Sequence, residues 1–387
     1  MRIITFYLPQ FHCIPENDKW WGEGFTEWVN VRKAEALFKG HQQPKIPLND
    51  NYYNLLDIEV MRWQTEIAKK YGIYGFCFYH YWFDGKMLLE KPVENYLNEK
   101  SIKFPYCICW ANEHWTNQWA TDKYNVLIEQ KYGSCKEWKE HFDYLLPFFK
   151  DDRYIKKDGK PVFVLYRPDL VECRKEMFGY WNQLCREAGL SGICYMCQRP
   201  DAMLSGIDSD ISMFDYCIEY QPGIAMKNLI CKKQKFATLR KIKRKVVLYA
   251  EKNFKISGNN LNISRMINND VKKFTYDEVW ESILNMSPVT EKSIPGAFVN
   301  WDNTPRKGKR GTVTTNVSSD KFHKYLSKQI ENAKNKYHQD MIFMFAWNEW
   351  AEGGFLEPDE ENGYAYLEAI KEALQENNEF HSYKSKT

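Results

Sequence analysis

Two glutamates, Glu349 and Glu352, stand three residues apart in the stretch FMFAWNEWAEGGFLEP (343–358). The stretch starts as an apolar strand and continues as a polar loop, and a helical turn there would place both carboxyls on one side. Burial among aromatic rings and mutual repulsion would push their pKa values apart, so that one is protonated near neutral pH and the other ionised. Such a pair can work as general acid and general base, which is the combination that cleavage of a glycosidic bond requires.

The elements that must position this pair are visible as eight short apolar runs, most of them without polar interruption, as is typical of strands buried on both faces of a parallel sheet. The runs span residues 2–8, 72–82, 104–110, 161–166, 192–198, 214–220, 295–301 and 341–347. Helical patterns lie between most of them, for example at 57–72, 135–150 and 321–337. This alternation predicts an α/β fold, a (β/α)8 TIM barrel forming a single domain over 1–387. An open doubly wound sheet is the alternative, but no glycine-rich phosphate turn follows the first run.

Two connections are too long to be simple loops. Residues 9–56 form a first βα loop rich in Trp, Gly and Pro, and its aromatic content argues against disorder. Residues 221–275 form an excursion between strands 6 and 7, which we expect to be helical, and it carries the basic run KKQKFATLRKIKRK (232–245). We interpret this run as a solvated helical face, with a surface for acidic glycan, lipid phosphate or membrane as the alternative.

Polar or aromatic residues follow every one of the eight runs, and active sites of barrels lie at these C-terminal strand ends. Flat aromatic rings beside hydrogen-bonding groups suit the recognition of a sugar. The residues predicted to bind substrate are Gln10, His12, Trp28, His80, Tyr81, Trp110, Asn112, Glu113, Arg167, Glu219, Trp301, Asp302, Trp347 and Asn348. His12, His80 and His114 do not show a metal-binding spacing, so we predict neither a metal nor a cofactor.

The bulk composition excludes several classes of function. Lys and Arg number 54 against 51 Asp and Glu, a net charge of +3, which does not favour nucleic acid. The eleven cysteines are an odd number and are scattered, which predicts reduced thiols and a cytoplasmic protein. No stretch approaches the roughly 18 apolar residues of a membrane span. Membrane association is therefore expected to be at most peripheral, through the run 232–245.

Several motifs carry a resemblance to a known family. FYLPQFH…NDKWWGEGFTEWVNV, GIYGFCFYHYWFDGKMLLEKP, CICWANEHW, WDNTPR and WNEWAEGGFLEPD resemble the WbsX-like family of bacterial polysaccharide-biosynthesis proteins over residues 2–370. That family is similar to glycoside hydrolase family 99, the endo-α-mannosidase group, which is a (β/α)8 barrel. The resemblance implies that Glu352 is the general acid/base on the glycosidic oxygen. It also implies that Glu349 deprotonates the 2-hydroxyl of the sugar, giving retention through a 1,2-anhydro sugar.

Three functions remain open from the sequence. The first is a metal-independent enzyme that acts on the glycosidic bond of a bacterial surface polysaccharide, such as O-antigen lipopolysaccharide, or of its precursor. The second is a sugar-nucleotide-dependent glycosyltransferase. The sequence contains DSD (208–210), the spacing of a metal-binding D-x-D, but this segment stands before an apolar run rather than after a strand. The third is a glycan-binding barrel without catalysis. In each case the partner is a glycan or a glycolipid.

Overall fold

The strands form one barrel in the computed structural model, which describes the chain except for residues 118–124, 199–210, 234–269 and 381–387. All neighbours in the barrel are parallel, in the order β12-β10-β9-β8-β4-β2-β1-β15-β13. The strands are β1 (Arg2–Tyr7), β2 (Gly75–Phe83), β4 (Tyr106–Trp110), β8 (Lys160–Leu165), β9 (Cys194–Gln198), β10 (Tyr216–Ile218), β12 (Ser293–Ile294), β13 (Gly296–Phe298) and β15 (Met341–Phe345). Each of the eight predicted runs overlaps one strand of the barrel, and the seventh run contains β13, while β12 lies just before it.

The seventh strand closes the barrel in two halves that meet at Pro295. β12 pairs with β10 through Cys217 and Ser293, and β13 pairs with β15 through Gly296 and Phe343. Proline has no N–H to give to a ladder, so the strand changes partner at that residue. A side chain at Gly296 would lie 2.0 Å from the carbonyl oxygen of Glu219, so only glycine allows β10 to come this close. The predicted (β/α)8 barrel is confirmed.

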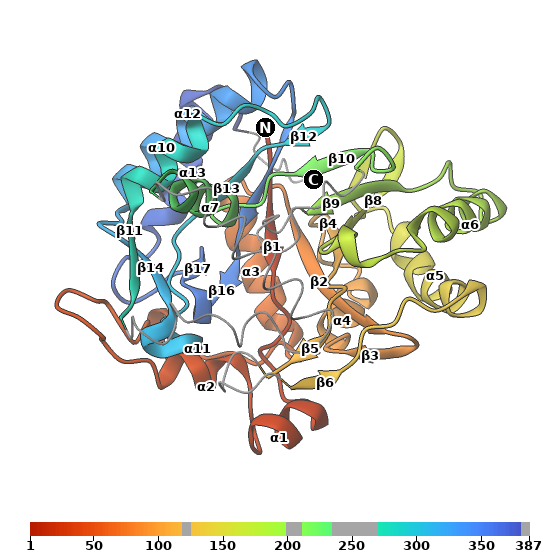
Figure 1. The fold of residues 1–387 in the computed structure, drawn as a ribbon, viewed down its shortest axis with the longest axis horizontal. Coiled ribbons are helices and arrows are strands. Elements are labelled where there is room, and N and C mark those ends of the chain that lie inside the picture. The colour runs from red at the N-terminus through yellow and green to blue at the C-terminus, as the bar shows by residue number, and fades with distance from the viewer. Residues whose placement is uncertain (118–124, 199–210, 234–269, 381–387) are drawn as a thin grey trace, which may run out of the picture.

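Helices surround the barrel and alternate with its strands over most of the described chain (Figure 1). Asp57 caps α3, accepting a bond from the Glu59 N–H at 3.0 Å, and Ser318 caps α12 in the same way. The apolar faces of these helices pack on the outer side of the strands. The helices are α3 (Ile58–Lys70), α4 (Lys91–Asn98), α5 (Cys135–Phe149), α6 (Arg174–Glu187), α7 (Gly223–Lys233), α10 (Tyr276–Leu284), α12 (Ser319–Asn335) and α13 (Ala365–Glu376).

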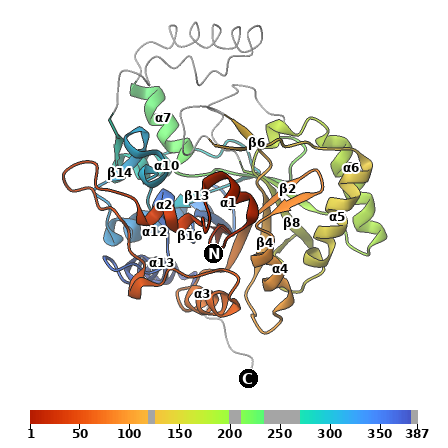
Figure 2. The ribbon, with the colours of Figure 1, turned by 90° about the horizontal axis from the view of Figure 1, so that it is seen from below.

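The loops that follow the C-terminal strand ends gather at one end of the barrel. The long first loop contains α1 (Pro15–Trp21), α2 (Glu27–Arg32) and the short 3-10 helix η1 (Leu48–Asp50). β5 (Trp115–Thr116) pairs with β6 (Val126–Ile128), and α11 (Thr304–Lys307) follows the seventh strand. Figure 1 shows these pieces together at the lower end of the molecule, and Figure 2 shows α1 and α2 across the mouth of the barrel.

Several short strands and single turns flank the barrel. β3 (Lys86–Leu88) folds back on β2, β7 (Lys156–Lys157) folds back on β8, and η2 (Pro168–Leu170) and η3 (Gly308–Arg310) are single turns. β11 (Lys272–Thr275) pairs in parallel with β14 (Thr312–Thr315). The described part of the predicted excursion 221–275 is therefore helix α7 and strand β11. The basic run 232–245 lies outside the described residues after Lys233, which ends α7.

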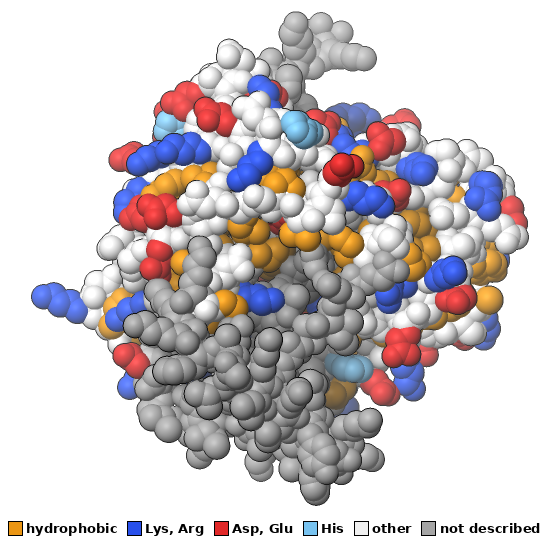
Figure 3. Space-filling view, turned by 45° about the horizontal axis from the view of Figure 1, so that its top comes forward, with side chains coloured by type: hydrophobic (Ala, Val, Ile, Leu, Met, Phe, Trp, Pro, Cys, Tyr) orange, Lys and Arg blue, Asp and Glu red, His pale blue; other side chains and the backbone are white. Residues whose placement is uncertain are grey.

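The charges on the surface are mixed and the cysteines are free thiols, as the composition predicts. On the face in Figure 3, acidic and basic side chains are interspersed. All eleven cysteines are free, and Cys194 and Cys197 are both buried. Among the helices that the structure describes, none has the length and apolar character needed to cross a membrane. The cytoplasmic location stays a prediction.

Candidate active site

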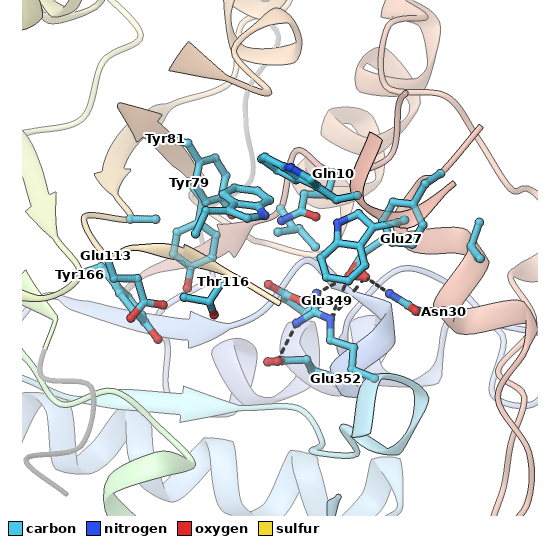
Figure 4. A pocket seen from close by; sticks show the side chains of 18 of the residues that line it. Gln10, Glu27, Asn30, Tyr79, Tyr81, Glu113, Thr116, Tyr166, Glu349 and Glu352 are labelled. Carbon is cyan, nitrogen blue, oxygen red and sulfur yellow. Dashed lines mark hydrogen bonds and ion pairs between the residues drawn. The ribbon is translucent and has the colours of Figure 1, made fainter. Parts of the chain in front are cut away.

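A cavity of about 450 Å³ opens at the loop-covered end of the barrel. Barrel strands and strand ends supply its floor, and the first loop and the β5 segment supply its walls (Figure 4). The lining residues are Leu8, Gln10, Trp20, Trp21, Phe25, Glu27, Val29, Asn30, Lys33, Tyr79, Tyr81, Ala111, Glu113, His114, Trp115, Thr116, Tyr166, Tyr220, Arg306, Phe345, Glu349 and Glu352.

The chain after β15 delivers both glutamates of the E-x-x-E pair to this cavity. Glu349 ends the short strand β16 (Asn348–Glu349), and Glu352 ends the 3-10 helix η4 (Trp350–Glu352). Gly353 follows with φ = 67°, and the strand β17 (Gly354–Phe355) then returns against β16. Gly353 takes a backbone conformation that L side chains rarely adopt, and a Cβ at Gly354 would lie 2.2 Å from the Phe345 ring. The two glycines therefore allow a turn tight enough to keep both carboxyls in one cavity.

One arginine binds three carboxyls at the centre of the site. Arg306, on α11, donates from Nη1 to Glu352 at 2.7 Å and from Nη2 to Glu349 at 3.3 Å. Its Nε donates to Glu27 at 2.9 Å, and its Nη2 also bonds to Glu27. The side chains of all four residues are at most 10% exposed. Figure 4 shows Glu27, Glu349 and Glu352 pointing toward the same place.

Three carboxyls around one guanidinium leave surplus negative charge in a buried site. Burial raises the pKa of Glu349 to about 8; Arg306 lowers this pKa, while Glu352 and Glu27 raise it. Glu349 therefore holds a proton at neutral pH in the ligand-free protein. The two glutamates differ in their contacts with Arg306, because the bond to Glu352 is shorter by 0.6 Å (3.3 − 2.7).

A fourth buried carboxylate, Glu357, holds the turn from behind. Its two oxygens accept four hydrogen bonds, among them one from the Trp350 indole N–H at 2.6 Å and one from the Tyr53 hydroxyl at 2.8 Å. The Trp347 indole N–H and the Gln64 amide donate to its other oxygen at 3.1 and 2.6 Å. The two indoles beside the E-x-x-E pair are thus tied to the first loop and to α3 through one carboxylate.

Replacing Glu357 by glutamine should lower the free energy of unfolding by about 1–3 kcal/mol. The glutamine keeps one oxygen acceptor, so the donors that bonded to the other oxygen face an amide NH₂ group and lose their hydrogen bonds. Urea unfolding at pH 7.5 measures this change. Glu360→Gln is the matched control: Glu360 lies on the same loop, is exposed and accepts one backbone N–H from Asn49. Its change should stay within about 0.5 kcal/mol. Equal effects of the two substitutions would show that Glu357 does not anchor the turn.

The wall that follows β4 is polar. His114 accepts the backbone N–H of Gln130 at its Nδ1, at 2.8 Å, so the neutral ring carries its proton on Nε2. Glu113 and Thr116 line the same wall, with Tyr166 from the end of β8 beside them (Figure 4). This side of the cavity offers both hydrogen-bond donors and acceptors to a ligand.

The wall that the first loop supplies is mostly apolar. Trp20 and Trp21 of α1, Phe25 and Val29 line it, and the Trp20 ring reaches across to Trp115 with ring centroids 6.0 Å apart. The cavity therefore combines aromatic surfaces on one side with hydrogen-bonding groups on the other. This is the arrangement that ligands with both apolar faces and hydroxyl groups require.

Five residues of the predicted site line the cavity, namely Gln10, Tyr81, Glu113, Glu349 and Glu352. Four others lie on the opposite side of the barrel wall. His80 bonds to His141 of α5 at 2.9 Å between Nε2 atoms, and the Trp110 indole packs on that same His141. Glu219 accepts the Tyr337 hydroxyl at 2.7 Å, and Trp347 packs on Phe76.

The remaining predicted residues do not line the cavity, and several of them connect its loops. Asn112 and Arg167 exchange two bonds, of 2.7 and 2.8 Å, that join the ends of β4 and β8. Asn348 makes the same kind of pair with the backbone of Leu8. Asp302 accepts bonds from His41 and Gln43 of the first loop, and the Trp28 ring packs on Trp350. Trp301 packs on Phe345, and His12 is buried.

The sequence reasoning did not select several residues that line the cavity. Glu27 is the most important of these, together with Arg306 and the three floor tyrosines Tyr79, Tyr166 and Tyr220. Strand alternation could have found Tyr79, which lies two residues before the selected Tyr81. No local signal marks Glu27. Within the described residues, no group of three or more His, Cys, Asp or Glu is arranged to hold a metal ion.

Solved structures with this architecture include the GH99 endo-α-mannosidase from Bacteroides thetaiotaomicron, with a TM-score of 0.52 and 13% identity over 97% of both chains. Another is a structure described as a glycoside hydrolase-like protein, with a TM-score of 0.53 and 12% identity over 96% of this chain and 93% of the other. At these identities the likeness shows a common fold.

The chain belongs to the Glycosyltransferase WbsX family, whose model matches residues 3–370. Two relatives from Xanthomonas campestris pv. campestris, each described as "Uncharacterized protein WxcX", are 33% identical over 384 residues, which is 96% of this chain. The chain spans about half the length of these relatives (49%).

Proposed function

We propose that the protein acts on an α-glycosidic bond of a manno-configured or related sugar, by retaining glycosidase-type chemistry. The observation that carries this proposal is the pair Glu349 and Glu352, which share one cavity and one guanidinium but contact that guanidinium unequally. The substrate is a bacterial surface polysaccharide or its precursor, free or as a glycolipid. The family membership and the GH99 architecture support this choice of substrate class.

The proposed reaction has two steps. The reaction starts with the proton of the pair on Glu352, so the proton that Glu349 holds in the ligand-free protein moves to Glu352 when substrate binds. In the first step, Glu349 takes the proton of the 2-hydroxyl while O2 forms a bond to C1, and the bond from C1 to the glycosidic oxygen breaks as Glu352 protonates that oxygen. The product is a 1,2-anhydro sugar. In the second, Glu352 takes a proton from water or an acceptor hydroxyl, whose oxygen bonds to C1 as the C1–O2 bond breaks, and Glu349 returns its proton to O2. Two inversions at C1 give retention.

The walls of the cavity have matching roles in this proposal. Gln10, Tyr81, Glu113 and His114 hydrogen-bond sugar hydroxyls, and the Trp20, Trp21 and Trp115 rings stack on the apolar faces of sugar rings. The predicted residues that do not line the cavity, such as Asn112 and Asp302, keep the loops in register. This division separates groups that contact substrate from groups that position them.

The proposal is tested with α-manno-oligosaccharides of defined linkage and their analogues that lack the 2-hydroxyl at the cleaved unit. Cleavage or transfer of the parent compounds with retained configuration, followed by proton NMR of the first product, is the expected result. The 2-deoxy analogues should not react, because O2 is the internal nucleophile. Turnover of the 2-deoxy compound at the parent rate would contradict this mechanism.

A second candidate is transfer from a sugar nucleotide, which the description of the matched family favours. The DSD segment (208–210) lies outside the described residues. Titration with nucleoside diphosphates, with and without Mg²⁺ or Mn²⁺, distinguishes the two candidates: tight, metal-dependent binding would favour the nucleotide-dependent reaction. Glycan binding without turnover, unchanged in a double variant of Glu349 and Glu352, would instead indicate a binding protein.

A further inference from the structure

Glu27 occupies one whole edge of the Arg306 guanidinium. Its carboxylate takes the bond from Nε at 2.9 Å and a second bond from Nη2. Nη1 is then directed to Glu352 at 2.7 Å, and Glu349 receives only the far side of Nη2, at 3.3 Å. A bidentate arginine–carboxylate pair fixes the plane of the guanidinium as well as its position. The unequal contacts of Arg306 with Glu349 and Glu352 therefore follow from its pairing with Glu27.

The first loop holds Glu27 rigidly in this place. Its backbone N–H donates to the carbonyl of Gln10 at 3.0 Å, and the Asn30 amide donates to its carboxylate at 2.6 Å. The neighbouring Trp28 packs against Trp350 of η4, with ring centroids 5.5 Å apart. The Glu27 side chain is 3% exposed. A buried acid with this many partners keeps one orientation, and Arg306 keeps its orientation with it.

Apart from Arg306, the described groups that face Glu349 most directly are acidic or neutral. Arg306, Glu352 and Glu27 act on it directly, and the hydroxyls of Tyr79, Tyr81 and Tyr220 also face it from β2 and from the end of β10. Burial raises the pKa of all three tyrosines, so they are neutral at physiological pH. Arg306 is a cation that contacts both carboxyls of the pair, and its unequal pairing makes the surroundings of the two carboxyls different.

We infer that Glu27 is a positioning residue that holds Arg306 against Glu352 and away from full pairing with Glu349, so that the two carboxyls enter the reaction as unlike groups. The inference deepens the proposed function and rests on it for its catalytic meaning. The unequal pairing of Arg306 with Glu349 and Glu352 is itself a property of the ligand-free protein. Without the carboxylate at position 27, Arg306 can turn its Nε edge toward Glu349 and stabilise the ionised form of that carboxyl.

The test is a titration of the ligand-free protein by infrared spectroscopy, which detects a protonated carboxyl group. The band that disappears in Glu349→Gln belongs to Glu349, and the pH at which half of it is lost is its titration midpoint. In Glu27→Gln this midpoint should fall by about 1–3 pH units, because a negative neighbour is lost and Arg306 is released. Glu23→Gln, an exposed residue four positions earlier in the same loop, is the matched control and should leave the midpoint unchanged.

Asn30→Ala provides a second variant, in case Glu27→Gln does not fold. It removes one bond to Glu27 and leaves the charge, so a smaller shift in the same direction is expected. Unchanged midpoints in the folded variants would overturn the inference. The infrared test needs no substrate, so its failure is separate from failure of the proposed reaction. Where substrate is available, the high-pH limb of kcat/KM should move with the infrared midpoint, while KM at the pH optimum changes little. A fall in kcat/KM at unchanged pH dependence would indicate a merely structural role and overturn the inference.

Discussion

Replacing Glu352 by glutamine is expected to lower kcat on an unactivated α-glycoside by about 10²–10⁴-fold, the usual contribution of general acid catalysis. Without a proton donor, the departing oxygen must leave as an alkoxide. The substitution is nearly isosteric, and the glutamine oxygen can still accept the bond from Arg306 that Glu352 accepts at 2.7 Å. The fold should therefore remain intact, which circular dichroism and the urea midpoint can check.

The leaving group distinguishes the acid from other roles. An aryl glycoside whose phenol is acidic needs little protonation as it departs, so the defect of Glu352→Gln should be much smaller on it. Glu360→Gln, an exposed change on the same loop, is the control and should leave kcat unchanged on both substrates. Full activity of Glu352→Gln on the unactivated glycoside would show that Glu352 is not the acid.

The second large effect concerns Glu349, as the base that removes the proton of the 2-hydroxyl. Glu349→Gln should lower kcat by about 10²–10⁴-fold on unactivated and aryl substrates alike, because formation of the C1–O2 bond limits both. The different response to the leaving group separates this residue from Glu352. Kinetics of both variants on the same two substrates form the complete test.

The raised pKa of Glu349 adds a prediction about pH. Because burial raises this pKa to about 8, the residue is mostly protonated at pH 7 in the free enzyme. The reaction needs a base and also a proton for Glu352 to donate, so kcat/KM should fall above about pH 8, where the free enzyme loses the proton that the pair must supply. Measuring kcat/KM from pH 6 to 9 in stable buffers tests this. A profile that keeps rising through pH 9 would show that this proton is not needed and would contradict acid catalysis by the pair.

The barrel was predictable because its strands are buried on both faces. Runs such as FPYCICW (104–110) carry no polar interruption, and each run overlaps one strand of the barrel. The break at Pro295 was not predicted, since a proline at the start of an apolar run does not show which neighbour the strand pairs with on either side. The first loop was predicted as one long segment, and the structure adds the short helices α1 and α2 within it.

The side of the barrel wall was the main difficulty in predicting the site. Successive side chains of a strand point to opposite faces, so Tyr79 and Tyr81 face the cavity while His80 between them faces α5. The same alternation puts Tyr220 inside and Glu219 outside. Polarity alone selected His80 and Glu219, because a buried polar residue with a hydrogen-bond partner looks the same in sequence as one that awaits a ligand.

Glu27 and Arg306 could not be paired from sequence for another reason. They are 279 residues apart, and neither stands in a recognisable spacing with the other. The contact exists because the first loop and the loop after the seventh strand meet over the same barrel end. The closed barrel brings these two residues together, and no pattern in the single sequence predicts their contact.

The closure of the barrel also sets the order in which the protein becomes competent during synthesis. β1 pairs with β15 on one side, through residues such as Arg2 and Met341, and β13 pairs with β15 as well. A nascent chain that has emerged only to residue 340 therefore has open edges on both β1 and β13. The unpaired backbone groups of such edges can pair with strands of other chains. Glu27 and Arg306 are then already made, but both carboxyls of the pair are missing. Residues 341–352 both close the sheet and carry the reactive groups, so the closed barrel and the carboxyl pair depend on the same segment.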